Sequence, residues 1–130
     1  MSEVSGPDGL EASGERLKAI LEELHSESRD VQASMIVTHD GLTMLVLGSV
    51  IDPDRFGAMC ADLLSLCRSA AAELVRGQIE QVLMKATSGY MLLTPAGQQA
   101  VLAIMARPDT NLGMLLIDAA RAAAAIPGSL

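Results

Sequence analysis

The chain has 130 residues, half of them hydrophobic, and a formal net charge of −7 from 16 acidic and 9 basic side chains. This length is typical of one domain, and the apolar content is ample for a core. No cluster of Lys and Arg occurs, which argues against nucleic acid as a partner, because affinity for phosphates comes from clustered cations. With one Phe, one Tyr and no Trp, the chain also lacks an aromatic platform on which bases could stack.

The apolar stretches are interrupted by charged residues or Gly before they reach the roughly 18 to 20 residues of a membrane span. The first residues are acidic and polar, unlike a secretory signal. A cytoplasmic protein without membrane insertion is therefore expected. Cys60 and Cys67 stand seven positions apart on one predicted helix, about 10 Å from each other and beyond disulfide reach. We expect reduced core thiols, with a disulfide between two subunits as the alternative.

The first elements follow from composition and periodicity. Residues 1–14 are rich in Ser, Gly and acidic side chains, which predicts a flexible N-terminal tail. Residues 15–28 have an apolar stripe at helical spacing, so an amphipathic helix is expected there. Residues 33–38 and 42–47 are rich in β-formers and are separated by a turn containing Asp40 and Gly41. An Asp-Gly pair between such runs predicts a β-hairpin.

A helix of about six turns is predicted from Pro53 to Val75. Asp52 can cap its free amides, Pro53 suits its first position, and Gly77 is placed to end it. Its bulky apolar residues occupy about half of its circumference, and this half is expected to face the core: Phe56, Met59, Cys60, Leu63, Leu64, Leu66, Cys67, Ala70, Ala71, Leu74 and Val75.

The other half of this helix has small side chains at three- and four-residue spacing. They form a shallow ridge that lets another helix approach closely. The ridge consists of Gly57, Ala61, Ser65, Arg68 and Ala72. We expect it to contact a second chain. The alternative is a solvated face in which Ala is simply a good helix former.

The rest of the chain is predicted to form three strands and a helix. The strands are expected at residues 78–86, 90–94 and 98–106, joined by short turns that imply an antiparallel meander. A helix is expected over residues 111–126, ended by Pro127 and Gly128, which leaves residues 127–130 as the C-terminal end. The order αββαβββα indicates an α+β fold with one antiparallel sheet. In the strand at residues 78–86, apolar and polar residues alternate least clearly between the two faces, so we place this strand at an edge of the sheet.

Few residues suggest chemistry. His25 and His39 have no Cys or carboxylate neighbours at metal-ligand spacing, so no metal site is predicted. No Gly-rich phosphate loop is present, and candidate nucleophiles such as Ser65, Ser88 and Cys60 lack an evident base. A catalytic site and a cofactor are therefore not expected, and the chain is not interpreted as an enzyme.

Several local motifs, in their order and spacing, resemble the Roadblock/LC7 domain family. The motifs are VTHDGLTMLVLG at residues 37–48, DPDRFGAM at 52–59, SGYMLLTPAGQQAVLAIMA at 88–106 and PDTNLGMLLIDAARAA at 108–123. The resemblance spans residues 15–126. It implies a profilin-like sandwich, in which a five-stranded antiparallel sheet has the long helix on one face and two shorter helices on the other.

The resemblance also implies partners. Members of this family are usually homodimers or heterodimers, in which the third strands pair across the dimer axis and the long helices lie side by side. They bind small Ras-like GTPases or serve as assembly platforms, and MglB-type members act as GTPase-activating proteins without an arginine finger. The expected function is a non-enzymatic dimeric regulator of a small Ras-like GTPase, with a light-chain-type scaffold as the alternative. On the third strand, the expected interface residues are Glu80, Val82, Leu83 and Lys85.

Overall fold

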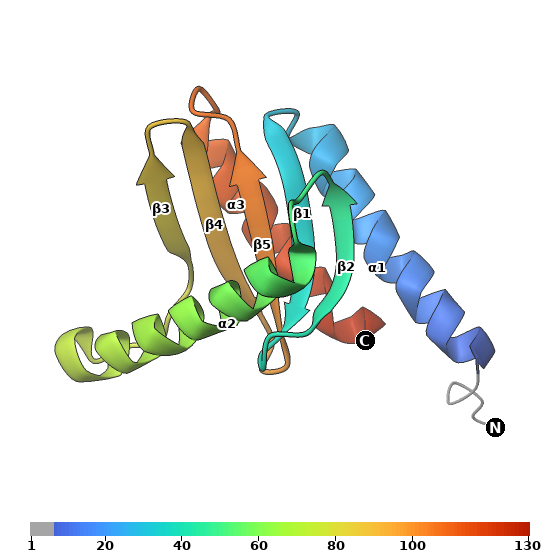
Figure 1. The fold of residues 1–130 in the computed structure, drawn as a ribbon, viewed down its shortest axis with the longest axis horizontal. Coiled ribbons are helices and arrows are strands. Elements are labelled where there is room, and N and C mark those ends of the chain that lie inside the picture. Colours follow the sequence, from blue (N-terminus) through green and yellow to red (C-terminus); the bar gives the residue numbers. More distant parts are fainter. Residues whose placement is uncertain (1–6) are drawn as a thin grey trace.

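The computed structural model describes residues 7–130, and its elements follow in the expected order αββαβββα (Figure 1). Two short segments supplement them, a π turn after the second helix and a 3₁₀ turn near the C-terminus. The elements are α1 (Pro7–Glu27), β1 (Val31–Thr38), β2 (Thr43–Gly48), α2 (Pro53–Ala70), η2 (Ala71–Val75), β3 (Val82–Ala86), β4 (Gly89–Ala96), β5 (Ala100–Ala106), α3 (Leu112–Ala125) and η3 (Pro127–Ser129).

The five strands form one antiparallel sheet in the order β2-β1-β5-β4-β3. The pairs β1–β2, β3–β4 and β4–β5 are hairpins, whereas the central pair β1–β5 joins segments that are far apart in the sequence. The predicted hairpin turn forms at Asp40 and Gly41, where Gly41 has a φ of 99°. As expected, β3 lies at an edge, with β4 as its one strand neighbour in the chain described here.

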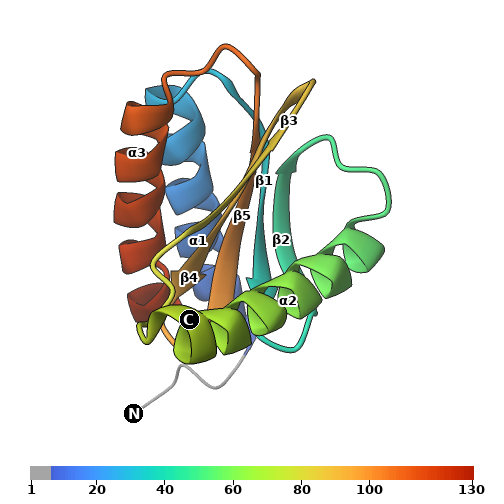
Figure 2. The same ribbon diagram turned by 90° about the vertical axis from the view of Figure 1, so that its left-hand side faces the viewer.

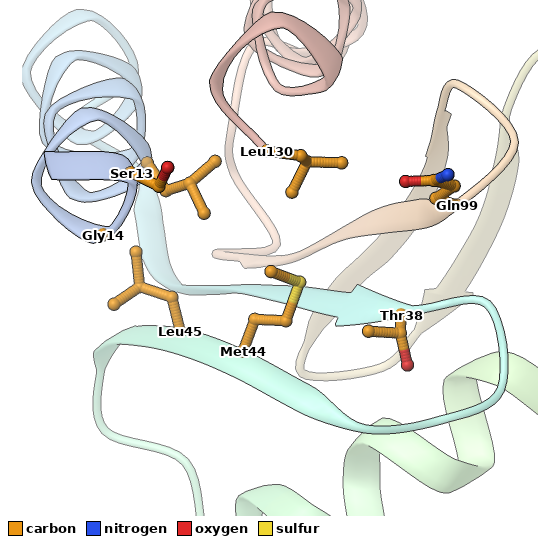
Figure 3. A pocket seen from close by; sticks show the side chains of 8 residues that line it. Ser13, Gly14, Thr38, Met44, Leu45, Gln99 and Leu130 are labelled. Carbon is orange, nitrogen blue, oxygen red and sulfur yellow. The ribbon is translucent and has the colours of Figure 1, made fainter. Parts of the chain in front are cut away.

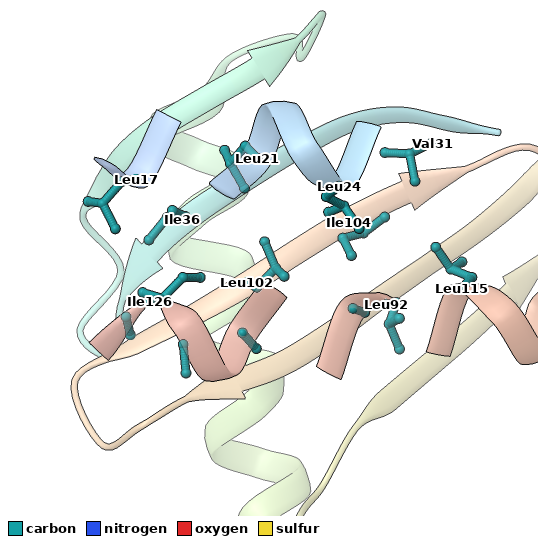
Figure 4. Packing of buried hydrophobic residues seen from close by; sticks show 14 of the residues in the cluster. Leu17, Leu21, Leu24, Val31, Ile36, Leu92, Leu102, Ile104, Leu115 and Ile126 are labelled. Carbon is teal, nitrogen blue, oxygen red and sulfur yellow. The ribbon is translucent and has the colours of Figure 1, made fainter. Parts of the chain in front are cut away.

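Two helices cover one face of the sheet and one covers the other. In Figure 2, α1 and α3 lie side by side against one face, and α2 crosses the opposite face. The larger core lies under α1 and α3. It contains Leu21 and Leu24 from α1, Ile36 and Ile104 from the central strands, and Leu115 from α3, all buried (Figure 4).

The smaller core lies under α2. Cys60 and Leu64 of this helix are buried against Met35, Val37 and other residues of the sheet. Among the strands, helix α2 contacts β1 and β2 most, and its C-terminal part and η2 extend past β3 (Figure 1). The two faces of the sheet are therefore unequally covered.

Three differences from the expected elements bear on how the chain packs. Helix α1 begins at Pro7 rather than Glu15, so part of the expected tail is helical; residues 1–6 lie outside the described part. Proline fits a first helical position because the N–H it lacks would have no partner there. The third strand begins at Val82 rather than Gln78.

The third difference concerns Pro95, which was expected in a turn but lies within β4, opposite Val101 of β5. A proline removes one hydrogen bond from a sheet and is tolerated where a strand has a free side. The last residue of β4 paired with β3 is Leu93, opposite Val82. Beyond this pair β5 is the one strand beside β4, so the side of β4 that faced β3 is free. The N–H that Pro95 lacks would have no strand partner on that side.

Helix α3 is more apolar than expected. The segment Leu112–Ser129 has a mean hydropathy of 1.2, which satisfies a membrane span by length and composition, although 28% of it is buried in the fold. Many of its residues are alanines, and one face packs in the larger core through Leu115, Ala119 and Ala123. The segment also carries Asp118, which accepts a hydrogen bond from Ser28 Oγ at 2.6 Å and pairs with Arg121 at 3.3 Å.

His25 lies in the last turn of α1, as expected, and connects this helix to the sheet. Its Nε2 atom lies 2.8 Å from Oγ of Ser34, a fully buried residue of β1. Partial burial lowers the pKa of the His25 imidazole below its ordinary value of 6.5, because desolvation disfavours the charged ring. The folded protein therefore holds His25 in its neutral form at neutral pH.

We expect thermal stability to fall as the pH drops below about 6.5 and through the lowered pKa of His25. The unfolded chain binds this proton more readily than the folded one, so protonation favours unfolding. Melting temperatures between about pH 5 and pH 8 measure the effect. His25→Gln should flatten the curve, whereas His39→Gln, at an exposed turn position, should not. An unchanged slope in His25→Gln would show that another group is responsible.

Candidate interaction surface

The start of α2 is fixed by the predicted cap. Asp52 adopts a left-handed conformation, and its Oδ1 atom accepts a hydrogen bond from the N–H of Arg55 at 3.3 Å. Pro53 follows at the beginning of the helix, and its carbonyl accepts a hydrogen bond from Thr43 Oγ1 on β2 at 2.9 Å. The cap and this contact hold the N-terminal half of α2 against the β1–β2 hairpin.

The N-terminal half of the predicted ridge is buried inside the subunit, which corrects its expected role as an interface. Gly57 and Ala61 pack against the hairpin rather than facing outward. A Cβ atom on Gly57 would overlap Thr43 Oγ1 and would lie 3.3 Å from the carbonyl oxygen of Gly41. The small side chains therefore allow the helix to approach its own sheet closely.

Several bulky residues of α2 and η2 that were expected in the core are exposed. The exposed fractions are 55% for Met59, 69% for Leu66, 82% for Leu74 and 77% for Val75. Ala70 is also exposed. The reason is the oblique course of the helix: its sheet-facing side is narrow, and its C-terminal part extends beyond the strands.

Ala70, Leu74 and Val75 border an apolar groove of about 310 Å³ between the end of α2 and the start of β3. It is lined by Cys67, Ala70, Ala71, Leu74, Val75, Ile79, Gln81 and Val82. Met84 of β3 is 46% exposed and lies two residues from Val82, hence on the same face of the sheet. We call Met59, Leu66, Leu74, Val75 and Met84, together with this groove, the α2–β3 surface.

The remaining predicted interface residues lie on other surfaces. Ser65, Arg68 and Ala72 are exposed on the side of α2 that is turned away from Leu66 and Leu74. On the third strand, Leu83 is 40% exposed and Lys85 is exposed; both lie on the face covered by α1 and α3. Glu80 precedes β3 and is exposed, whereas Val82 packs against the smaller core. The structure therefore separates residues that the sequence grouped into one interface.

Helix α2 ends in an unusual way. Residues 71–75 form a π turn, and Arg76 has a left-handed conformation with a φ of 64°. Its N–H donates to the carbonyl oxygen of Ala71 at 2.6 Å. The residue with the left-handed conformation is therefore Arg76, not Gly77 as the sequence suggested. For a residue other than Gly this conformation costs about 1–2 kcal/mol.

The described residues form no recognisable catalytic arrangement. Desolvation by burial raises the pKa of the Cys60 thiol to about 11, which makes it a poor nucleophile at neutral pH. Both cysteines are free, and Cys67 is half-buried. Among residues that the structure describes, no group of three or more His, Cys, Asp or Glu could hold a metal ion.

A separate hollow of about 410 Å³ lies beside β2, between α1 and the C-terminal residue. Met44, Leu45 and Leu130 project toward it, with Thr38 and Gln99 near its rim (Figure 3). The side chains that line it carry hydroxyl and amide groups but no carboxylate or imidazole.

The family model of the Roadblock/LC7 domain matches residues 17–106. The chain belongs to the Roadblock/LC7 domain family. Members of this family are generally regulatory domains without catalytic activity. The Uncharacterized protein MJ0310 of Methanocaldococcus jannaschii is 31% identical over 99 residues, which are 75% of this chain and 86% of that protein.

Solved structures share the fold. The Roadblock/LC7 domain from Streptomyces avermitilis aligns with a TM-score of 0.78 at 23% identity, over 85% of this chain and 93% of that one. The gliding protein MglB from Thermus thermophilus aligns with a TM-score of 0.83 at 17% identity, over 91% and 90% of the two chains. A profilin, LokiProfilin1 from a complex with rabbit actin, aligns at 0.65 and 12% identity over 89% and 97%, so the Roadblock/LC7 fold here is profilin-like.

We expect Gly57→Ala to lower the free energy of unfolding by about 1–3 kcal/mol, the usual cost of overpacking. The added Cβ would displace Thr43 Oγ1 from its hydrogen bond with the carbonyl oxygen of Pro53. Gly14→Ala is the matched control in α1, where a Cβ meets nothing within 4 Å, and it should stabilise by up to about 1 kcal/mol. Urea denaturation measures both. Equal effects in the two variants would contradict the close packing of α2.

Proposed function

We propose that this Roadblock/LC7 protein is a non-enzymatic, dimeric regulator of a small Ras-like GTPase and that it acts in the cytoplasm. The observation that carries the proposal is the α2–β3 surface, where exposed apolar side chains lie beside an open strand edge in a family of regulatory domains. The likeness of the fold to MglB supports a GTPase as the regulated partner.

The edge of β3 supports self-association. Val82–Ala86 pair with β4 on one side, and the backbone groups on the other side have no strand partner in the chain described. Such an edge is a template for another strand. Two copies of β3 can pair in antiparallel fashion about a two-fold axis, which would join two sheets into one of ten strands.

The C-terminal part of α2 and η2, which extend past β3, support the same arrangement. Leu66 of α2 and Leu74 and Val75 of η2 are exposed in the single subunit. Burying one such side chain contributes about 1.5–3 kcal/mol. A second copy paired along β3 would bring its own sheet and its own α2 next to this end of the helix. A single two-fold interface would then pair the open edge of β3 and bury the apolar side chains of the helix.

The GTPase requires a surface that remains open in this dimer. Ser65, Arg68 and Ala72 lie on the side of α2 turned away from Leu66 and Leu74, so they remain accessible when the α2–β3 surface is covered. We place the GTPase contact on this side. The light-chain-type scaffold remains the alternative, and it differs because its binding would not depend on the nucleotide.

We expect Leu66→Glu to raise the dissociation constant of the dimer at least tenfold. The substitution would place a charge in an apolar interface, and tenfold corresponds to about 1.4 kcal/mol, less than the burial of one Leu contributes. Because Leu66 is 69% exposed in the subunit, folding should be unaffected. Sedimentation and light scattering measure the oligomeric state.

Leu42→Glu is the matched control for this experiment. Leu42 is 67% exposed at the β1–β2 turn, outside the α2–β3 surface, and its substitution makes the same change of charge. It should leave the dimer intact. A dimer that persists in Leu66→Glu would overturn the α2–β3 surface as the dimer interface. A wild-type protein that is monomeric would overturn the proposed self-association.

We expect the protein to bind at least one small Ras-like GTPase from the same genome, with affinities for the GTP-analogue and GDP states that differ at least about tenfold. Titration calorimetry with each GTPase in each nucleotide state measures this. Equal affinity in both states would favour the scaffold, and no binding in either state to any of them would overturn the proposed regulation.

A further inference from the structure

A polar cleft lies on the Arg68 side of the end of α2, and it adjoins the apolar groove of the α2–β3 surface at Ile79, which lines both. Its volume is about 430 Å³, and three segments meet around it: the end of α2, the connection to β3, and the β4–β5 turn. It is lined by Arg68, Ala72, Gly77, Gln78, Ile79, Pro95, Gly97 and Gln98. We call it the Arg68 cleft.

The charge of this cleft is opposite to that of the protein. Its polar side chains are one guanidinium and the two amides of Gln78 and Gln98, all of which can donate hydrogen bonds, and no carboxylate lines it. The chain as a whole carries a net charge of −7. The Arg68 cleft is thus a small basic site in an acidic protein.

Arg68 has no carboxylate partner within the described part of the chain. The ion pairs found there involve Arg107 and Arg121. Along the helix, the positions three and four residues from Arg68 are occupied by Leu64, Ser65, Ala71 and Ala72, which carry no charge. The guanidinium can therefore accept a carboxylate without breaking an existing ion pair.

We propose that the Arg68 cleft receives an aspartate or glutamate side chain of the bound GTPase, a proposal that rests on the proposed function. Arg68 binds the carboxylate through its planar pair of N–H groups, and the amides of Gln78 and Gln98 donate further hydrogen bonds. The contact adds specificity for one partner. An unrelated protein would leave Arg68 without a carboxylate or would place a cation beside it, and either would weaken binding.

Binding of the GTPase to variants of Arg68 tests the proposal. Arg68→Glu should weaken binding at least tenfold and leave the dimer intact, whereas Arg68→Lys should retain part of the affinity because it keeps the charge. The affinity of the wild type should also fall more steeply than that of Arg68→Gln when ionic strength rises from about 0.05 M to about 0.5 M.

Arg55→Glu is the matched control. It makes the same change of charge on the same helix, but Arg55 lies in the first turn, away from the cleft. It should alter binding less than threefold, a small factor compared with the tenfold effect expected of Arg68→Glu. Equal losses in Arg68→Glu and Arg55→Glu, or no loss in Arg68→Glu, would overturn the role of the cleft while leaving the proposed function standing.

A second experiment does not depend on a GTPase. N-acetyl-glutamate amide is titrated into isotope-labelled protein, and the side-chain N–H signals of Arg68, Gln78 and Gln98 are followed by NMR. These signals should shift with saturation in the wild type. In Arg68→Gln the signals of Gln78 and Gln98 should not shift, and N-acetyl-glutamine amide should produce no shift in either protein. Saturable binding without any GTPase partner would support the cleft and reject the proposed function. No shift in the wild type would overturn the cleft as a carboxylate site.

Discussion

One helix cannot cover a five-stranded sheet, and the surfaces of this protein depend on that constraint. Strands lie about 4.8 Å apart, so five of them span about twice the diameter of a helix, which is about 10 Å. Helices α1 and α3 together cover one face, whereas α2 alone crosses the other. Because Gly57 fixes α2 close to the β1–β2 hairpin, the uncovered area falls on the opposite side, next to β3.

Much of the fold could be predicted from local signals. The turn at Gly41 and the cap at Asp52 depend on neighbouring residues, and the structure places both as expected. The order of elements and the edge position of β3 followed from short connections and mixed strand faces. Such features need no knowledge of what packs against them, which is why the sequence alone was sufficient.

The orientation of α2 could not be predicted in the same way. Periodicity showed one bulky face and one small face, and the bulky face was assigned to the core. In the structure the small Gly57 and Ala61 face the sheet, and Leu66 and Leu74 face outward. The sequence pattern of an apolar helix face is the same whether that face packs on the sheet of its own subunit or on a partner. Periodicity therefore does not tell the two apart. The helix has more bulky apolar residues than one face can bury, and this excess was the sequence signal that some of them would be exposed.

The π turn after α2 gives the chain a place where its length can change by one residue. A π turn takes one more residue than an α turn, so it accommodates the extra residue within a single turn. Its marker is the N–H of Arg76, which donates to the carbonyl oxygen five residues earlier, that of Ala71. Deletion of one residue from the π turn would convert it into an ordinary α turn and leave the elements on either side of it in place.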